Sequence, residues 1–228
     1  MSLHDRLNTA RRQPGKALER DFSWNRRINT LKLVHIAVMS NLGFYQCSEA
    51  DRIAMTEAAI ARRQTVVSRW TALATDEAEP WSARSAEAAK WLQGAKTVLD
   101  VGCGTMGLER YLDTCYIPSD VVRRDDRTIV MDYNQEGPPA IEVDAVAVLG
   151  VLEYLHDPGS FLAGLRACKA VISYCVTDAK APLQPRRAHA WVNDLSTLDV
   201  ADMLQASGWT IQSHKPIDDI QTLWLAVK

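Results

Sequence analysis

The stretch VLDVGCGTMGLERYL at residues 98–112 constrains the fold more than any other part of this chain. It begins with an apolar run typical of a buried strand, and three glycines at G-x-G-x-x-G spacing follow. Apolar residues at helical intervals come next and predict a helix over about 105–112. A strand that passes into a helix through glycines lets bare backbone approach a bound molecule. The stretch therefore predicts a ligand-binding turn, and the kind of ligand has to come from its surroundings.

Short apolar strands and helices alternate from residue 95 to the end of the sequence. Strands are predicted at 97–101, 115–122, 127–132, 144–149, 170–176, 209–214 and 222–227, and helices near 105–112, 158–168 and 194–207. This alternation predicts an α/β fold with a doubly wound, mostly parallel sheet that is covered by helices on both faces.

The residues before position 95 show helical periodicity and no convincing strand. The segment 28–45 is apolar but is too short and too polar to span a bilayer, and a buried helix is favoured over an interfacial one. A second helix is predicted over 48–74, with Ser48 as its N-cap and Asp51 in the place of the capping-box acid. A third helix, from 82, is expected to end at Gly94.

Aspartates accompany three successive predicted strands. Asp100 lies two residues before the first glycine of the turn, where a carboxylate would repel a pyrophosphate but suits a ligand with an ammonium or sulfonium group. Asp120 ends the second strand, where an acid can accept hydrogen bonds from both ribose hydroxyls of a nucleoside. Asp132 ends the third strand, at the edge where doubly wound folds bind their ligands.

At these residues the sequence resembles the class I S-adenosylmethionine-dependent methyltransferases, over about residues 81–228. VLDVGCGTMG is similar to the family's glycine-rich first motif, and YIPSDVV, VMDYN and DAVAVLGVLEYLHDP are similar to the segments around the next three strands. The resemblance implies a Rossmann-like methyltransferase fold with a seven-stranded sheet, and S-adenosyl-L-methionine as the cofactor. The implied cofactor-binding residues are Asp100, Gly102, Cys103, Gly104, Asp120, Val121, Asp132, Tyr133, Leu149 and Gly150.

Two histidines are the candidate catalytic residues. An acceptor hydroxyl needs a base within hydrogen-bond reach, and a histidine has a suitable pKa near neutrality. His156 follows the fourth predicted strand, and His189 lies in the long segment after the fifth strand, from which the family often draws substrate contacts. Asp178 and Tyr174 are weaker candidates. No group of residues has metal-ligand spacing, so no metal is expected.

The expected acceptor is a small molecule. Arg186 and Arg187 lie beside Trp191 on the expected substrate side, and such pairs recognise carboxylate or phosphate, which favours an anionic or sugar-linked metabolite. Trp81 and Arg84 could close over the cofactor. We expect residues 1–94 to form a helical lid or an assembly region, which could make the protein a homodimer, and residues 95–228 to form the S-adenosylmethionine-binding methyltransferase domain.

Other functions and partners remain open at this point. A protein methyltransferase or a non-catalytic cofactor-binding partner would fit the same motifs. In a nicotinamide-dependent oxidoreductase, Arg123 and Arg124 would hold a 2′-phosphate, but Asp100 argues against it. The net charge of −2 and the lack of a basic, aromatic-laced stripe argue against nucleic acid as a partner. The five scattered cysteines and the lack of an apolar leader or a membrane span favour a cytoplasmic protein with no membrane partner.

Overall fold

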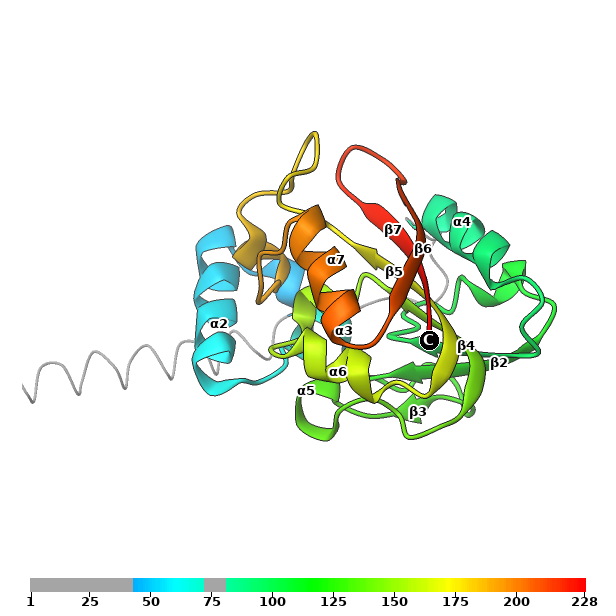
Figure 1. Cartoon of the computed structure of the whole chain (residues 1–228). Helices are drawn as coiled ribbons and strands as arrows, with labels where there is room; N and C mark the ends of the chain where they lie inside the picture. Colours follow the sequence, from blue (N-terminus) through cyan, green and yellow to red (C-terminus); the bar gives the residue numbers. More distant parts are fainter. Residues whose placement is uncertain (1–42, 72–80) are drawn as a thin grey trace, which may run out of the picture. The chain divides into compact units, whose positions relative to one another are not determined.

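Seven strands form one sheet in the order β3-β2-β1-β4-β5-β7-β6 in the computed structural model, which describes residues 43–71 and 81–228 (Figure 1). The strands are β1 Thr97–Val101, β2 Cys115–Asp120, β3 Ile129–Val130, β4 Val143–Leu149, β5 Ala167–Tyr174, β6 Thr210–Pro216 and β7 Thr222–Val227. The first five pair in parallel, and β7 is antiparallel to both β5 and β6. The predicted mostly parallel seven-stranded sheet is confirmed, with all seven strands near their predicted positions.

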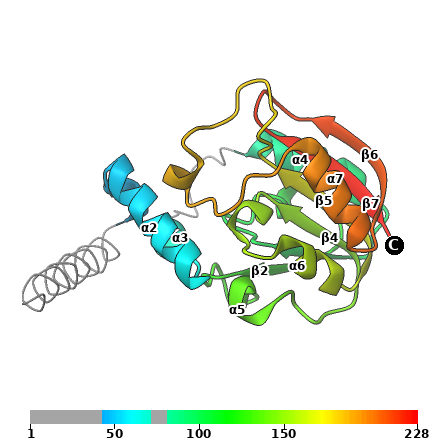
Figure 2. The same ribbon diagram turned by 60° about the vertical axis from the view of Figure 1, so that its left-hand side comes forward.

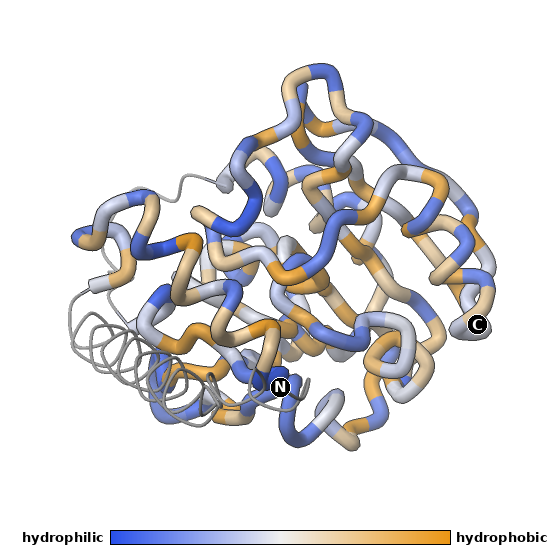
Figure 3. Tube along the Cα trace, turned by 90° about the vertical axis from the view of Figure 1, so that its left-hand side faces the viewer, coloured by the Kyte–Doolittle hydropathy of each residue, from blue (hydrophilic) through white to orange (hydrophobic). Residues whose placement is uncertain are grey.

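The two faces of the sheet belong to two separate hydrophobic clusters, because alternate side chains of each strand point to opposite faces. Leu99 and Val101 lie in a cluster with residues of α6 Pro158–Gly164 and α7 Thr197–Ala206. Val98 lies in the other cluster, which α4 Ser82–Leu92 covers. Figure 1 shows α4 on the opposite side of the sheet from α6 and α7, and Figure 3 shows hydrophobic strands inside a largely hydrophilic periphery.

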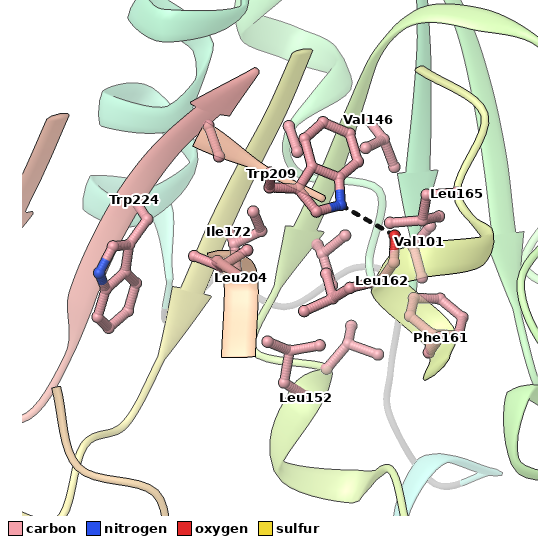
Figure 4. Close-up of a cluster of buried hydrophobic side chains, with 14 of the residues drawn as sticks. Val101, Val146, Leu152, Phe161, Leu162, Leu165, Ile172, Leu204, Trp209 and Trp224 are labelled. Carbon is pink, nitrogen blue, oxygen red and sulfur yellow. Dashed lines mark hydrogen bonds between the residues drawn. The ribbon is translucent and has the colours of Figure 1, made fainter. Parts of the chain in front are cut away.

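Trp209 closes the first cluster at the start of β6. Its side chain is 2% exposed, and its indole Nε1 donates a hydrogen bond of 2.9 Å to the carbonyl oxygen of Leu162 on α6 (Figure 4). Trp224 on β7 belongs to the same cluster. The indole hydrogen bond satisfies the polar atom of a large buried side chain, so the ring fixes α6 against the sheet without an unpaired donor.

The described part of the helical segment predicted over 48–74, residues 48–71, contains two helices. Ser48 caps α2 Glu49–Arg62 as predicted, since its Oγ accepts a hydrogen bond of 3.2 Å from the Asp51 amide. The helix ends early because Arg63 adopts a left-handed conformation with φ +53°, and β-branched residues follow it. The chain then forms the short helix α3 Ser68–Thr71. Figure 2 shows α2 beside the segment that follows β5, which includes the 3-10 turn η4 Arg186–His189.

The helix predicted over 105–112 is wrong. This connection from β1 to β2 contains only the 3-10 turn η2 Glu109–Tyr111. Gly104 and Met106 both have positive φ, +54° and +59°, so the backbone cannot begin a right-handed helix there. The apolar spacing instead reflects a single turn in which Leu108 is buried and Tyr111 is exposed.

The remaining differences are smaller. The helix predicted near 158–168 ends at Gly164, because Ala167 and Cys168 already pair in β5. The short helix α5 Tyr133–Glu136 and the 3-10 turns η1 Phe44–Gln46 and η3 Leu152–Tyr154 were not predicted. Within residues 43–71 and 81–94 there is no strand, as predicted, and Gly94 follows α4 with φ +84°. The helix predicted over 28–45 lies almost entirely outside the described residues.

Candidate functional site

A pocket of about 270 Å³ lies at the carboxyl ends of β1, β2 and β4. The order of the sheet reverses between β1 and β4, since the chain adds β2 and β3 on one side and then crosses to the other side. Such a reversal leaves a crevice above the strand ends, which is where open α/β sheets bind ligands. The topology therefore places the pocket where the strand-end motifs predict a site.

The glycine turn after β1 forms one wall of the pocket. Gly102 and Gly104 have φ of +65° and +54°, a region that favours glycine. A Cβ atom on Gly102 would lie 2.5 Å from a methyl carbon of Val151, so no larger residue fits there. The Gly102 amide donates to the Tyr133 hydroxyl at 3.0 Å, and the Gly104 amide donates to Asp120 at 2.9 Å. These bonds hold the backbone of the turn open toward the pocket.

Asp120 is the buried acid of the site. Its side chain is at the end of β2 and lines the pocket, although the residue is only 3% exposed. Oδ2 accepts the bond from the Gly104 amide, while Oδ1 accepts one of 2.9 Å from the Val122 amide and lies 3.4 Å from the Arg124 guanidinium. The carboxylate thus orders the glycine turn and the loop after β2 at the same time.

All predicted cofactor-binding residues except Asp100 line the pocket. Those that line it are Gly102, Cys103, Gly104, Asp120, Val121, Asp132, Tyr133, Leu149 and Gly150. Asp100 lies on β1 with the same side-chain parity as Val98, and its Oδ2 accepts a hydrogen bond of 2.6 Å from the Tyr116 hydroxyl. Tyr116 belongs to the cluster under α4, so Asp100 is directed to that side and is 3% exposed.

Asp132 and Tyr133 connect the site to the residues before the sheet. Asp132 caps α5 by accepting a bond of 3.0 Å from the Asn134 amide, and the same oxygen accepts one of 2.6 Å from the Thr65 hydroxyl. Tyr133 donates from its hydroxyl to Ser119 at 2.9 Å, and burial raises the pKa of its phenol. Thr65 lies in the break between α2 and α3, so the break is fixed to the sheet at this point.

The half of the pocket beyond the glycine turn is lined by aromatic rings. Trp70 and Tyr154 are in edge-to-face contact with ring centroids 4.8 Å apart, and the Trp191 Nε1 donates to the Tyr154 hydroxyl at 3.1 Å. His189 lies against Trp191 at 5.0 Å. Tyr45 also lines the pocket, with its ring 4.4 Å from the Arg69 guanidinium carbon. We call these five residues the aromatic wall: Tyr45, Trp70, Tyr154, His189 and Trp191.

The structure separates the two candidate histidines. His189 lines the pocket at the end of η4, and its pKa is lowered below 6.5 by burial and by the nearby Arg52, Arg69 and Arg186. His156 does not line the pocket, and its Nε2 lies 3.0 Å from the Gln64 carbonyl oxygen in the break between α2 and α3.

The arginine pair expected to recognise the acceptor has other contacts. Arg186 is 4% exposed, donates to the Cys175 carbonyl at 2.8 Å and to the Tyr174 hydroxyl at 2.7 Å, and pairs with Asp194. Arg187 also pairs with Asp194, at 2.7 Å. Neither arginine lines the pocket. The weaker candidates, Tyr174 and Asp178, do not line it either, whereas Trp81 and Arg84 do.

Glu153 lines the pocket and was not among the predicted residues. It is 1% exposed, its Oε1 accepts a hydrogen bond of 2.8 Å from the Cys175 amide, and its Oε2 has no hydrogen-bond partner among the described residues. Burial raises the pKa of this carboxyl above 4.5, although Arg84 and Arg186 act in the opposite direction. The available signal was an acid inside the apolar run VLEYL directly after a strand.

The raised pKa of Glu153 predicts a pH dependence of stability. The folded protein binds the proton of this carboxyl more tightly than the unfolded chain, whose carboxyl has the ordinary pKa of 4.5. The stabilisation from this proton is complete below pH 4.5 and is lost as the pH rises toward the raised pKa. The loss is up to about 1.4 kcal/mol per pH unit. Urea unfolding at pH 5, 6 and 7 should therefore show the free energy of unfolding of Glu153→Gln increasing relative to wild type. Glu57→Gln, at an exposed position of α2, is the control, and parallel profiles for all three proteins would contradict the assignment.

No group of three or more histidines, cysteines or acids that could hold a metal ion occurs in residues 43–71 and 81–228. In the same ranges, no helix is both long enough and apolar enough to cross a membrane.

Comparisons with known proteins give a match in structure but not in sequence. No family model matches the chain, and no curated protein matches it either. The 1,6-didemethyltoxoflavin-N1-methyltransferase of Burkholderia thailandensis, solved with 1,6-didemethyltoxoflavin and S-adenosylhomocysteine, is similar with a TM-score of 0.54 and 21% identity over 75% of this chain and 88% of that one.

Two further structures agree with this match. A SAM-dependent methyltransferase from Aquifex aeolicus has a TM-score of 0.50 at 17% identity, covering 65% of this chain and 93% of that one. Human N-acetylserotonin methyltransferase in complex with SAM has a TM-score of 0.50 at 16% identity, over 79% of this chain. The chain spans only 56% of the human enzyme. These likenesses show that the chain has the fold of S-adenosylmethionine-dependent methyltransferases.

Proposed function

We propose that this chain is an S-adenosylmethionine-dependent methyltransferase that acts on a small molecule. The observation that carries the proposal is a single pocket with two different halves. One half holds the glycine turn and the strand-end acid Asp120, and the other half is formed by the aromatic wall. A methyl donor and a separate acceptor need adjacent binding sites, because methyl transfer depends on alignment of the two molecules and on the exclusion of water.

The residues of the first half fit the cofactor. The open backbone at Gly102 and Gly104 admits a close approach. We expect the Asp120 carboxylate, which lines the pocket at the end of β2, to accept hydrogen bonds from the ribose hydroxyls. Arg84 lines the pocket beside Gly150, and its guanidinium would meet the carboxylate of the cofactor. We propose no contact for Asp100, because its side chain is directed to the opposite face of the sheet.

The bound cofactor supplies a methyl group on a sulfonium centre. The chain's own residues have two tasks, which are to hold the acceptor and to accept its proton where the nucleophile carries one. We assign the second task to His189, because it lines the pocket and its lowered pKa keeps the imidazole neutral at neutral pH. Tyr45, Thr65, Arg69 and Trp70 line the pocket from before the sheet, which supports a covering role for the helical region within residues 1–94.

Calorimetric titration tests the proposed cofactor directly. S-adenosylhomocysteine and S-adenosylmethionine are expected to bind with micromolar dissociation constants, or about −8 kcal/mol. NADPH is the control ligand and should bind far more weakly, because the Arg124 guanidinium is packed against Asp120 and the Trp70 carbonyl instead of facing a phosphate site. Tight binding of NADPH without a response to either sulfur compound would contradict the proposal.

A further inference from the structure

Arg69 on α3 is a buried cation in the aromatic half of the pocket. The residue lines the pocket and is 9% exposed. Its guanidinium carbon lies 4.4 Å from the ring centre of Tyr45 and 4.5 Å from that of Trp70. Within residues 43–71 and 81–228 no carboxylate lies at ion-pair distance from it, and its Nε has no hydrogen-bond acceptor.

The surroundings of Arg69 do not replace a counter-ion. The attraction of two ring faces for a guanidinium is smaller than the cost of removing an unpaired charge from water. Four acids line the pocket, and each has other partners. Asp120 lies 3.4 Å from the Arg124 guanidinium, and Asp132 accepts from the Thr65 hydroxyl and the Asn134 amide. Glu153 accepts from the Cys175 amide and burial raises its pKa, and Asp218 accepts hydrogen bonds from the amides of Ile220 and Gln221. The cation is therefore arranged for an anion that comes from outside the described chain.

The shape beside Arg69 favours a flat molecule. Trp70 from α3, Tyr154 from η3 and Trp191 from the segment after β5 are held in place by ring contact and by the Trp191–Tyr154 hydrogen bond. Rings fixed in this way present flat surfaces, which contact another ring over a larger area than a rounded aliphatic group, by offset stacking or edge contact.

We propose that the acceptor half of this pocket binds a flat aromatic carboxylate, with Arg69 as its anion anchor and the aromatic wall against its ring. A planar guanidinium presents two parallel N–H groups to a carboxylate, which suits a singly charged planar anion. That this ligand is the methyl acceptor rests on the proposed function. The binding preference itself does not.

The experiment is a calorimetric titration of the full chain saturated with S-adenosylhomocysteine. The probes are benzoate, 2-naphthoate and quinoline-2-carboxylate, each paired with its uncharged amide, and cyclohexanecarboxylate as the non-planar acid. At least one aromatic acid should bind about ten- to a hundredfold more tightly than its amide, because the charge-assisted bond to Arg69 is lost in the amide. The same acid should also bind more tightly than cyclohexanecarboxylate.

Arg69→Gln should reduce the preference for the acid over the amide to about onefold, while binding of S-adenosylhomocysteine is retained. Arg62→Gln, at an exposed position in the same helical segment, removes the same charge and should keep the preference. If Arg69→Gln does not fold, the comparison of acid and amide on the wild-type protein decides the matter.

Two results would overturn the inference. One is that no aromatic acid of the panel binds the loaded protein, and the other is that the amides bind as tightly as the acids. Either result leaves the proposed cofactor intact if S-adenosylhomocysteine has bound. Failure of S-adenosylhomocysteine to bind rejects the proposed function instead, and the acid and amide titrations on the unloaded protein then still test Arg69.

Discussion

Asp120→Ala is expected to lower the free energy of unfolding by about 2–4 kcal/mol and to weaken S-adenosylhomocysteine binding by about 1.5–3 kcal/mol. The first effect arises because the Gly104 and Val122 amides lose their acceptor in a buried place, and each unsatisfied donor costs about 1–3 kcal/mol. The second effect arises because the ribose loses its proposed partner and the glycine turn loses its support. Urea unfolding and calorimetry on the same preparation measure the two effects.

Asp120→Asn separates these contributions. The amide side chain keeps one oxygen that can accept from a backbone N–H, so stability should be recovered in part, while the charged acceptor for the ribose is still lost. Asp126→Ala, at an exposed position of the following loop, is the matched control and should change neither quantity. Unchanged binding in both Asp120 variants would show that this carboxylate has no role in holding the cofactor.

The strands could be predicted from the sequence because they are buried on both faces and so form short apolar runs. The connection from β1 to β2 could not. Its apolar spacing fits a helix, but Met106 has φ +59°. Methionine rarely adopts this left-handed conformation, and no pattern in the sequence predicts it. The break at Arg63 has the same physical origin, and it brings Thr65, Arg69 and Trp70 to the pocket.

The site could be predicted where topology alone determines it. Residues at the carboxyl ends of parallel strands meet at one edge, and the glycine turn, Asp120 and Asp132 do line the pocket there. Asp100 was expected there too, but it lies within β1, and side-chain alternation directs it with Val98 toward α4. Counting parity along the strand would have predicted this.

The acceptor half depends on contacts between distant segments, and sequence reasoning reached it only in part. Trp191 and His189 were singled out from the segment after β5. The arginines beside them were expected to recognise the acceptor, but Arg186 and Arg187 pair with Asp194. The buried cation of the pocket comes instead from Arg69, about 120 residues earlier in the chain. Nothing local distinguishes Arg69 from the exposed arginines of the same helical segment.

His189→Ala is expected to lower turnover by about 10²–10⁴-fold, the range usual for loss of a general base, with the affinity for S-adenosylhomocysteine nearly unchanged. The expectation holds for an acceptor whose O–H or N–H must lose its proton. Because the neutral imidazole is the active form, kcat/KM should rise with pH through the pKa of His189 and then stay level. That pKa is lowered from 6.5 by burial, Arg52, Arg69 and Arg186, while Glu49 acts in the opposite direction, so the rise should be centred below pH 6.5.

The pH profile distinguishes a base from a merely structural histidine. Arg52→Gln removes one of the positive charges that disfavour the imidazolium, so the pKa of His189 should increase and the rise in kcat/KM should move toward pH 6.5. His189→Ala should lack this rise altogether. His156→Ala is the control, because its ring contacts the Gln64 carbonyl outside the pocket, and it should keep both the turnover and the wild-type profile. Wild-type turnover and an unshifted profile in His189→Ala would show that transfer in this pocket relies on alignment of the acceptor alone.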